Sequence, residues 1–90
     1  MKPVSLITGS SRGIGRGIAL ELARAGTHDL VINYAGNEAA ARECRELCLE
    51  AGQGGIRAEI VRADVSQSAD RTAMLNFVEK TFGRLDLLVM

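Results

Sequence analysis

The residues that most clearly indicate chemistry lie near the N-terminus, in the stretch ITGSSRGIG over residues 7–15. Three glycines and two serines, with an arginine among them, follow directly on an apolar run. Glycine is unfavourable inside regular structure and is kept where the backbone needs a positive φ or where another group must approach closely. A bound phosphate is the commonest such group, so the stretch predicts an anion-binding loop between a strand and a helix.

Side chains for acid–base or nucleophilic catalysis are scarce. The chain has one tyrosine, Tyr34, one histidine, His28, and two lysines, and nothing in its spacing assembles a nucleophile, a base and an orienting group. The two cysteines, Cys44 and Cys48, are four residues apart, which matches no zinc-binding pattern. They fall on the apolar side of an amphipathic segment and are interpreted as small core residues. We therefore predict no catalytic residue and no metal site.

Composition limits the classes of partner. The chain has 90 residues, of which 47% are hydrophobic and 24% charged, as in an ordinary globular domain. Eleven basic and eleven acidic residues cancel and only 3% are aromatic, so neither the charge nor the stacking surface of a nucleic-acid binder is present. No apolar run approaches the roughly 18 residues of a membrane span, and the N-terminal one is too short for a signal peptide. We expect a cytoplasmic protein with no membrane partner.

Short apolar runs alternate with longer amphipathic segments, which is typical of strand–helix–strand units and a parallel sheet. Strands are expected at residues 4–8, 30–34, 57–63 and 87–89, and helices at 14–25, at 38–51 and from the N-cap Ser66 to Gly83. The residues expected on the buried faces of the three helices are Ile14, Ile18, Leu22 and Ala25, then Ala40, Cys44, Leu47, Cys48 and Ala51, then Ala73, Met74, Phe77 and Val78.

Two further stretches accompany the glycine loop, whose spacing is Thr8-Gly9-x-x-x-Gly13-x-Gly15. Asp64-Val65 ends the third strand, and GRLDLLV, residues 83–89, leads into the fourth. In these three motifs and their order, the chain resembles the short-chain dehydrogenase/reductase superfamily, whose members carry TGxxxGxG at this position. The loop and the stretch VINYAGNEAAA, residues 31–41, are most similar to the family's 3-oxoacyl-carrier-protein reductases. The resemblance covers all 90 residues.

The resemblance implies an α/β fold, a partial doubly wound (Rossmann) parallel sheet of four strands in the order 3-2-1-4 with three intervening helices. Residues 1–90 would be the N-terminal part of a dinucleotide-binding domain, and the chain ends after the fourth strand. That strand would lie on an exposed edge, because later strands of the full fold are missing. Exposed apolar edges pair with other chains, so we expect self-association or a homo-oligomer.

The resemblance also implies which residues hold the coenzyme. Those expected against its phosphates and ribose are Ser10, Ser11, Arg12 and, through its backbone amide, Ile14, whereas Gly9, Gly13 and Gly15 would allow the turn and the close approach. Asp64 would accept a hydrogen bond from the adenine amino group, and the Val65 amide would reach a ring nitrogen. The alternative for Asp64 is a carboxylate placed favourably near the start of the next helix, and both interpretations can hold together.

The choice between the two nicotinamide coenzymes depends on the end of the second strand. An NAD site usually has an acidic residue there, about 20 residues after the glycines, and this chain has Asn33 and Tyr34 on the ribose side. Arg12 adds a cation whose planar fork suits a phosphate, and in the resembling family a basic residue at this position accompanies NADP(H). NADP(H) is therefore expected in preference to NAD(H). The alternative is that Arg12 is a solvated loop residue.

The function implied by the resemblance is an NADP(H)-dependent oxidoreductase that acts on a carbonyl or an alcohol. In the family a tyrosine donates the proton, assisted by a lysine four residues later, but Tyr34 is followed at that distance by Glu38. The family's Asn-Asn-Ala-Gly after the fourth strand is also missing, which leaves the role of Thr8 open. We therefore expect the 90 residues to be the coenzyme-binding portion and to be inactive alone. The alternatives are a non-catalytic dinucleotide-binding or oligomerising module, and a site for a flavin or S-adenosylmethionine.

Overall fold

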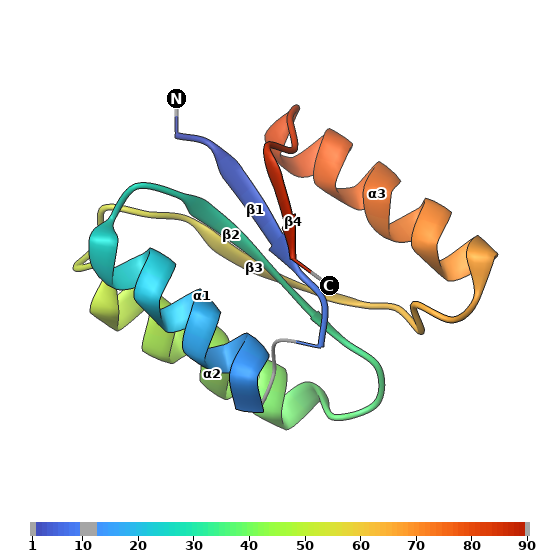
Figure 1. Cartoon of the computed structure of the whole chain (residues 1–90), viewed down its shortest axis with the longest axis horizontal. Coiled ribbons are helices and arrows are strands. Elements are labelled where there is room, and N and C mark those ends of the chain that lie inside the picture. The colour runs from blue at the N-terminus through green and yellow to red at the C-terminus, as the bar shows by residue number, and fades with distance from the viewer. Residues whose placement is uncertain (1, 10–12, 90) are drawn as a thin grey trace.

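The computed structural model describes residues 2–9 and 13–89, which form one parallel sheet with helices on both faces (Figure 1). The elements are β1 (Val4–Ile7), α1 (Gly13–Ala25), β2 (Asp29–Tyr34), α2 (Glu38–Ala51), β3 (Ala58–Arg62), α3 (Ser68–Phe82) and β4 (Leu87–Val89). The sheet order is β3-β2-β1-β4, and all three pairings are parallel. The predicted fold class and strand order are confirmed. Among the described helices, none has both the length and the apolar character needed to cross a bilayer.

The central strands β1 and β2 are buried on both faces because both are almost continuously apolar. Ile7 and Ile32 face α1 and α2, and they belong to a core that includes alanines and cysteines of those helices. Leu6 and Val31 face the other way, into a second core with Met74 of α3 and its neighbours. The sheet is thus covered by α1 and α2 on one face and by α3 on the other (Figure 1).

Helix α1 packs through smaller residues than the periodicity predicts. Ala19 and Ala23 are fully buried, and the expected Ile18 and Leu22 are only partly buried on either side of them. The expected burial of Ile14 and Ala25 is wrong, because both are exposed and Ile14 is 86% accessible in the first turn. A row of alanines lets the helix approach the strands closely, so the larger residues flank the contact and do not form its centre.

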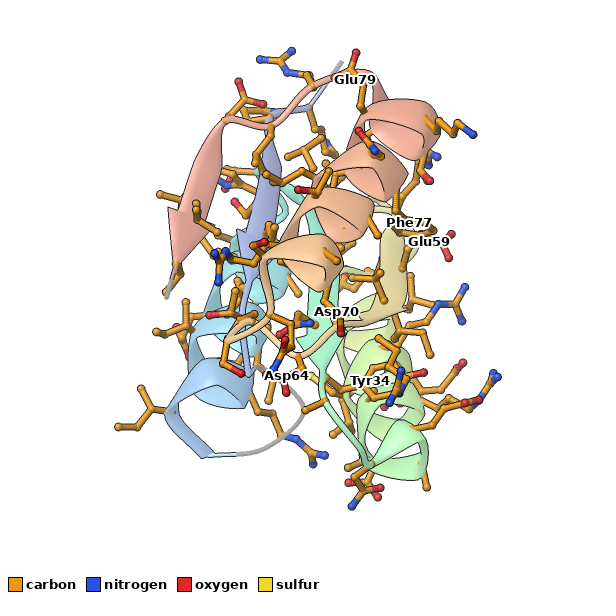
Figure 2. The ribbon with its side chains drawn as sticks, turned by 90° about the vertical axis from the view of Figure 1, so that its right-hand side faces the viewer. Tyr34, Glu59, Asp64, Asp70, Phe77 and Glu79 are labelled. Carbon is orange, nitrogen blue, oxygen red and sulfur yellow. The ribbon has the colours of Figure 1, made fainter. Side chains whose placement is uncertain are left out.

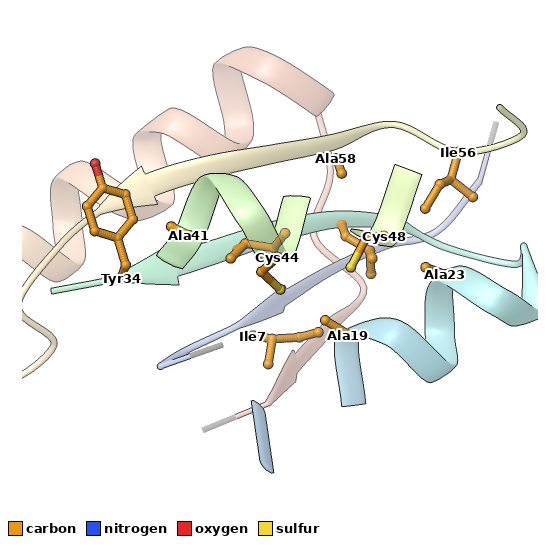
Figure 3. Packing of buried hydrophobic residues seen from close by; sticks show 11 residues of the cluster. Ile7, Ala19, Ala23, Tyr34, Ala41, Cys44, Cys48, Ile56 and Ala58 are labelled. Atoms are coloured by element: carbon orange, nitrogen blue, oxygen red, sulfur yellow. The ribbon is translucent and has the colours of Figure 1, made fainter. Parts of the chain in front are cut away.

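Helix α2 buries both cysteines, as expected, together with Ala41 (Figure 3). The predicted burial of Leu47 is wrong, since 38% of this residue is exposed. The hydrogen bond to Cys44, and to a lesser extent burial, raise the pKa of the Cys48 thiol, so this thiol stays neutral. The pair therefore acts as small apolar core residues that lie between α2 and the sheet.

Helix α3 begins at Ser68, and Gln67, at its N-cap position, makes no side-chain capping bond. The predicted N-cap role of Ser66 is wrong, because Gln67 occupies that position, and the Ser66 hydroxyl lies in the preceding turn, where it donates to Asp64 Oδ1 at 2.6 Å. The buried face consists of Met74, Val78 and Phe82, with Phe77 partly buried. Ala73 was expected on this face and is exposed, since it lies beside the i, i+4, i+8 row and not on it.

A carboxylate clamps the start of β1 to the start of β4. Asp86 Oδ2 accepts a hydrogen bond from the Val4 amide at 2.8 Å, and the Asp86 amide donates to the Val4 carbonyl at 2.9 Å. Arg84 donates to both carboxylate oxygens, at 2.7 and 2.6 Å. Hydrogen bonding from Arg84, and then from the Val4 amide, lowers the pKa of Asp86 to about 2. The clamp therefore joins segments 82 residues apart through a group that titrates in acid.

The clamp predicts a stability difference in acid. A carboxylate whose pKa is about 2 in the folded chain and about 3.9 in the unfolded chain contributes stability above pH ~4, and loses it as the pH falls through the folded value. Between about pH 4 and pH 2, wild type should therefore lose more free energy of unfolding than Asp86→Asn, as measured by urea unfolding at each pH. Glu50→Gln, at an exposed position of α2, is the control and should follow wild type. Parallel curves for wild type and Asp86→Asn would show that the clamp contributes nothing.

Candidate functional site

Three segments that each follow a strand meet at the carboxyl end of the parallel sheet. Because β1, β2 and β3 are parallel, the residues after each of them emerge at the same end, which is where doubly wound sheets bind ligands. The Thr8 amide and hydroxyl donate to the Val89 carbonyl at 2.9 and 3.2 Å, so Thr8 holds the end of β1 to the end of β4. The next amide, that of Gly9, donates to Asn33 Oδ1 at 3.1 Å, which connects the glycine loop to β2.

The glycines at the two ends of the described loop have left-handed backbones. Gly9 has φ +62° and Gly13 has φ +65°, and a Cβ atom added at either position would meet no other described residue within 4 Å. The left-handed backbone, and not crowding by the described residues, therefore favours glycine at both positions. Ser10, Ser11 and Arg12, expected at the phosphates, lie outside the described residues.

Helix α1 begins at Gly13, so the predicted Ile14 and Gly15 lie in its first turn. The first four amides of a helix have no partner within the helix, and its N-terminus carries partial positive charge. The first turn contains no acidic residue, and the Ile14 side chain is exposed. An anion placed between the loop and α1 would therefore meet backbone donors without a competing carboxylate from this turn.

The end of β2 supplies two buried side chains, Asn33 and Tyr34. The Tyr34 ring belongs to the core on the α2 side, near Ala41 (Figure 3), and its hydroxyl lies 3.4 Å from Glu38 Oε1. Hydrogen bonding from Arg42 lowers the pKa of Glu38, so the group beside the tyrosine hydroxyl is a carboxylate at neutral pH. The ring thus closes one side of the strand end, and no lysine or arginine of the described chain is hydrogen-bonded to its hydroxyl.

Asp64 follows β3 at the same end of the sheet, near the start of α3 (Figure 2). Its Oδ1 accepts hydrogen bonds from the amide and the hydroxyl of Ser66, at 3.0 and 2.6 Å, and these bonds lower its pKa. Its own amide donates to Asp70 Oδ2 at 2.8 Å. Among the described residues, the second carboxylate oxygen of Asp64 has no hydrogen-bond partner. Val65 is partly buried and packs against the core on the α3 side. Asp64 is thus an ionised, oriented acceptor at the site edge.

An open groove of about 390 Å³ lies between the N-terminal turns of α1 and α2. Its lining residues are Gly13, Arg16, Asn37, Ala39, Ala40 and Glu43. The Arg16 guanidinium donates to Glu43 Oε1 at 2.6 Å and to the Ala40 carbonyl at 3.1 Å, which fixes it beside α2. Asn37 caps α2 by accepting from the Ala40 amide at 2.9 Å. Arg16 is not among the residues predicted for the site, because its partner is 27 residues away and no local spacing indicates the pair.

Within residues 2–9 and 13–89, no three His, Cys, Asp or Glu side chains come together in a way that could hold a metal ion. The groups that this end of the sheet offers to a ligand include the backbone amides at the start of α1, the ionised carboxylate of Asp64 and the guanidinium of Arg16. These groups suit a ligand that carries phosphates and an amino-substituted ring.

Comparison with known proteins identifies the family of this chain. The model of the family described as short chain dehydrogenase matches residues 3–90. The chain is 42% identical over 86 residues to tetrahydroxynaphthalene reductase PfmaG of Pestalotiopsis fici, covering 96% of this chain and 30% of that protein. It is 39% identical over 89 residues to 3-oxoacyl-[acyl-carrier-protein] reductase FabG of Staphylococcus aureus, covering 99% of this chain and 35% of the relative.

A solved structure shows the same likeness in three dimensions. The crystal structure of YwfH, an NADPH-dependent reductase involved in bacilysin biosynthesis, superposes with a TM-score of 0.88 at 31% identity, over 98% of this chain and 36% of that one. The chain spans about a third of the length of the curated relatives that it matches. Because the family model matches residues 3–90 and the fold is shared, we conclude that this chain belongs to the short-chain dehydrogenase family.

Proposed function

We propose that this chain is the coenzyme-binding portion of an NADP(H)-dependent oxidoreductase that reduces a carbonyl or oxidises an alcohol. The observation that carries the proposal is the loop with left-handed glycines at Gly9 and Gly13, which leads from the end of β1 into the first turn of α1. The names of the relatives, reductases of a tetrahydroxynaphthalene and of a 3-oxoacyl group, support the reaction class. Residues 1–90 would then be the N-terminal part of a dinucleotide-binding domain that continues after β4.

The described residues fit a dinucleotide laid across the carboxyl ends of the strands. The pyrophosphate would lie at the start of α1, against the Ile14 and Gly15 amides, with Ser10, Ser11 and Arg12 from the loop beside it. Asp64 would accept from the adenine amino group through its second oxygen, since Ser66 occupies the first. The bound nicotinamide would supply or accept the hydride. In this arrangement, the backbone amides at the start of α1 would donate to the pyrophosphate, and Asp64 would accept from the adenine.

Two features support NADP(H) over NAD(H). The first is that Asn33 and Tyr34, the residues that end β2, carry no carboxylate of their own at the position where an NAD site usually has one, although the Glu38 carboxylate lies 3.4 Å from the Tyr34 hydroxyl. The second is the groove between the starts of α1 and α2, where a phosphate would meet two helix N-termini and the Arg16 guanidinium. Glu43 balances part of the charge of Arg16, which leaves Arg12 as the main cation expected at the 2′-phosphate. YwfH, which is an NADPH-dependent reductase, is consistent with this choice.

We propose that the 90 residues bind coenzyme without turning over a substrate. Tyr34 is the only tyrosine, it is buried in the core, and its hydroxyl lies beside the Glu38 carboxylate. No neighbouring cation is hydrogen-bonded to this hydroxyl in the described chain to favour its ionised form. The same feature favours the second candidate function, a non-catalytic module that binds a dinucleotide. The two candidates share one coenzyme site and differ in whether a proton donor is supplied from elsewhere.

Arg12→Ala tests the coenzyme preference. A charge-assisted bond to a phosphate contributes roughly 1.5–3 kcal/mol, so the dissociation constant for NADPH should rise at least about tenfold while that for NADH changes little. Fluorescence titration of both reduced coenzymes measures the two constants. Arg24→Ala, at an exposed arginine in the last turn of α1, is the matched control and should bind both like wild type. Equal NADPH binding by wild type and Arg12→Ala would refute the assignment.

Ala39→Asp tests whether the groove receives the 2′-phosphate. Ala39 is the second residue of α2, is exposed and lines the groove, so an acid there is favourable for the helix and should leave the fold intact. Repulsion of about 1 kcal/mol from a phosphate nearby should weaken NADPH binding about fivefold relative to NADH. Ala69→Asp, the same change at the second residue of α3, should leave the ratio of the two affinities unchanged. An unchanged ratio in Ala39→Asp would place the 2′-phosphate elsewhere.

We also propose that β4 makes the chain associate with itself. It is an edge strand of the described sheet, and Leu87 and Leu88 are 40% and 46% exposed. Sedimentation should therefore show species larger than a monomer that grow with concentration, and Leu88→Lys should shift them towards the monomer. The control is Leu47→Lys, at an exposed leucine of α2, which should sediment like wild type. A wild-type monomer at all concentrations would count against this role of the edge.

A further inference from the structure

Both polar atoms of the Asn33 side chain are hydrogen-bonded within the protein. It lies in β2, is 2% exposed and carries no charge. Its Oδ1 accepts the hydrogen bond from the Gly9 amide at 3.1 Å. Its Nδ2 lies 3.4 Å from the carbonyl of Val61, near the end of β3, and 3.2 Å from the carbonyl of Ala63, just after β3. One amide thus connects a loop 24 residues before it to a segment up to 30 residues after it.

The two partners of Asn33 lie directly next to the proposed coenzyme contacts. Gly9 opens the glycine loop, and its backbone is left-handed. Because its N–H is directed to Asn33, that donor is not available to a phosphate. Ala63 precedes Asp64, and its amide donates to the Tyr34 carbonyl at 2.9 Å, so the start of the adenine segment is held from both sides. The same side chain therefore sets the separation of the loop and the adenine segment.

The chemistry of the position requires an amide. A carboxylate could accept from Gly9 but would face the carbonyl oxygens of Val61 and Ala63 without a proton to share. An apolar side chain would leave the Gly9 amide without its partner, and a hydroxyl is too short to reach both segments at once. Asparagine has a donor and an acceptor at this length and adds no charge near the phosphates.

We infer that Asn33 is a positioning residue that holds the glycine loop and the Asp64–Val65 segment in register, and that it is not itself a ligand of the coenzyme. The inference rests on the proposed dinucleotide function. A residue that reads the ribose changes the ratio of the affinities for NADPH and NADH. A residue that positions both halves of the site changes the two affinities by the same factor, because it acts on the parts that the two coenzymes share.

The experiment compares wild type, Asn33→Ala and the matched control Asn76→Ala, at an exposed asparagine of α3. The first readout is hydrogen exchange of the Gly9 amide by NMR without coenzyme. We expect protection in wild type and in Asn76→Ala, and exchange at least about tenfold faster in Asn33→Ala. The second readout is titration with NADPH and NADH, where loss of the bond should raise both dissociation constants about three- to tenfold with their ratio kept.

The outcomes separate the inference from the proposed function. Wild type that binds neither coenzyme refutes the proposed function, and the Gly9 exchange still decides whether Asn33 holds the loop. If wild type binds coenzyme, three results for Asn33→Ala would each overturn the inference. These are an affinity equal to that of wild type, an unchanged exchange rate of the Gly9 amide, and a changed ratio of the NADPH and NADH affinities. Should Asn33→Ala fail to fold, Asn33→Ser retains a hydroxyl donor for the Ala63 carbonyl. This variant should fold, lose Gly9 protection and show the same parallel loss of affinity.

Discussion

The burial of β1 on both faces is the constraint on which the rest of this structure depends. Four residues, VSLI, lie between β2 and β4 and beneath helices on either side, and all four are fully buried. Such a strand is mostly apolar on both faces, here with the exception of the buried Ser5, and the backbone groups at both of its ends need hydrogen-bond partners from elsewhere. Asp86 fixes the first end at Val4, and Thr8 and Gly9 fix the second end through Val89 and Asn33. The glycine loop begins directly after this second end, so its position follows from the packing of β1.

The sequence predicts those parts of the fold that local patterns determine. Apolar runs separated by amphipathic segments identify the four strands, whereas the strand order, which the structure confirms, is implied by the family resemblance. Of the three loop glycines expected to allow a turn or a close approach, Gly9 and Gly13 have left-handed backbones. The burial of Cys44 and Cys48 also follows from helical periodicity alone. Each of these features depends on residues within a few positions of one another.

The errors and omissions have a common physical cause. Periodicity gives the direction of a side chain around a helix but not the distance of the helix from the sheet, so the close approach through Ala19 was missed. Ser66 has the right type for a helix cap, but α3 begins two residues later, and the Ser66 hydroxyl donates to Asp64 in the turn before the helix. Asn33 and Arg16 act through partners 24 to 30 residues away, and no spacing in the chain indicates such pairs. What decides these positions is tertiary contact, which a local pattern does not contain.

The position of β4 has a consequence for how the chain acquires its structure. β1 pairs with β2 across a separation of about 25 residues, but its pairing with β4 joins residues whose numbers differ by 82. During synthesis, the fully buried strand β1 therefore has one neighbour for most of the time, and its other edge stays open until the last residues of β4 have emerged. Open apolar edges are where growing chains misassociate. The three residues of β4 thus cover the open edge of β1, and a nascent chain that lacks them would leave β1 as an exposed edge strand.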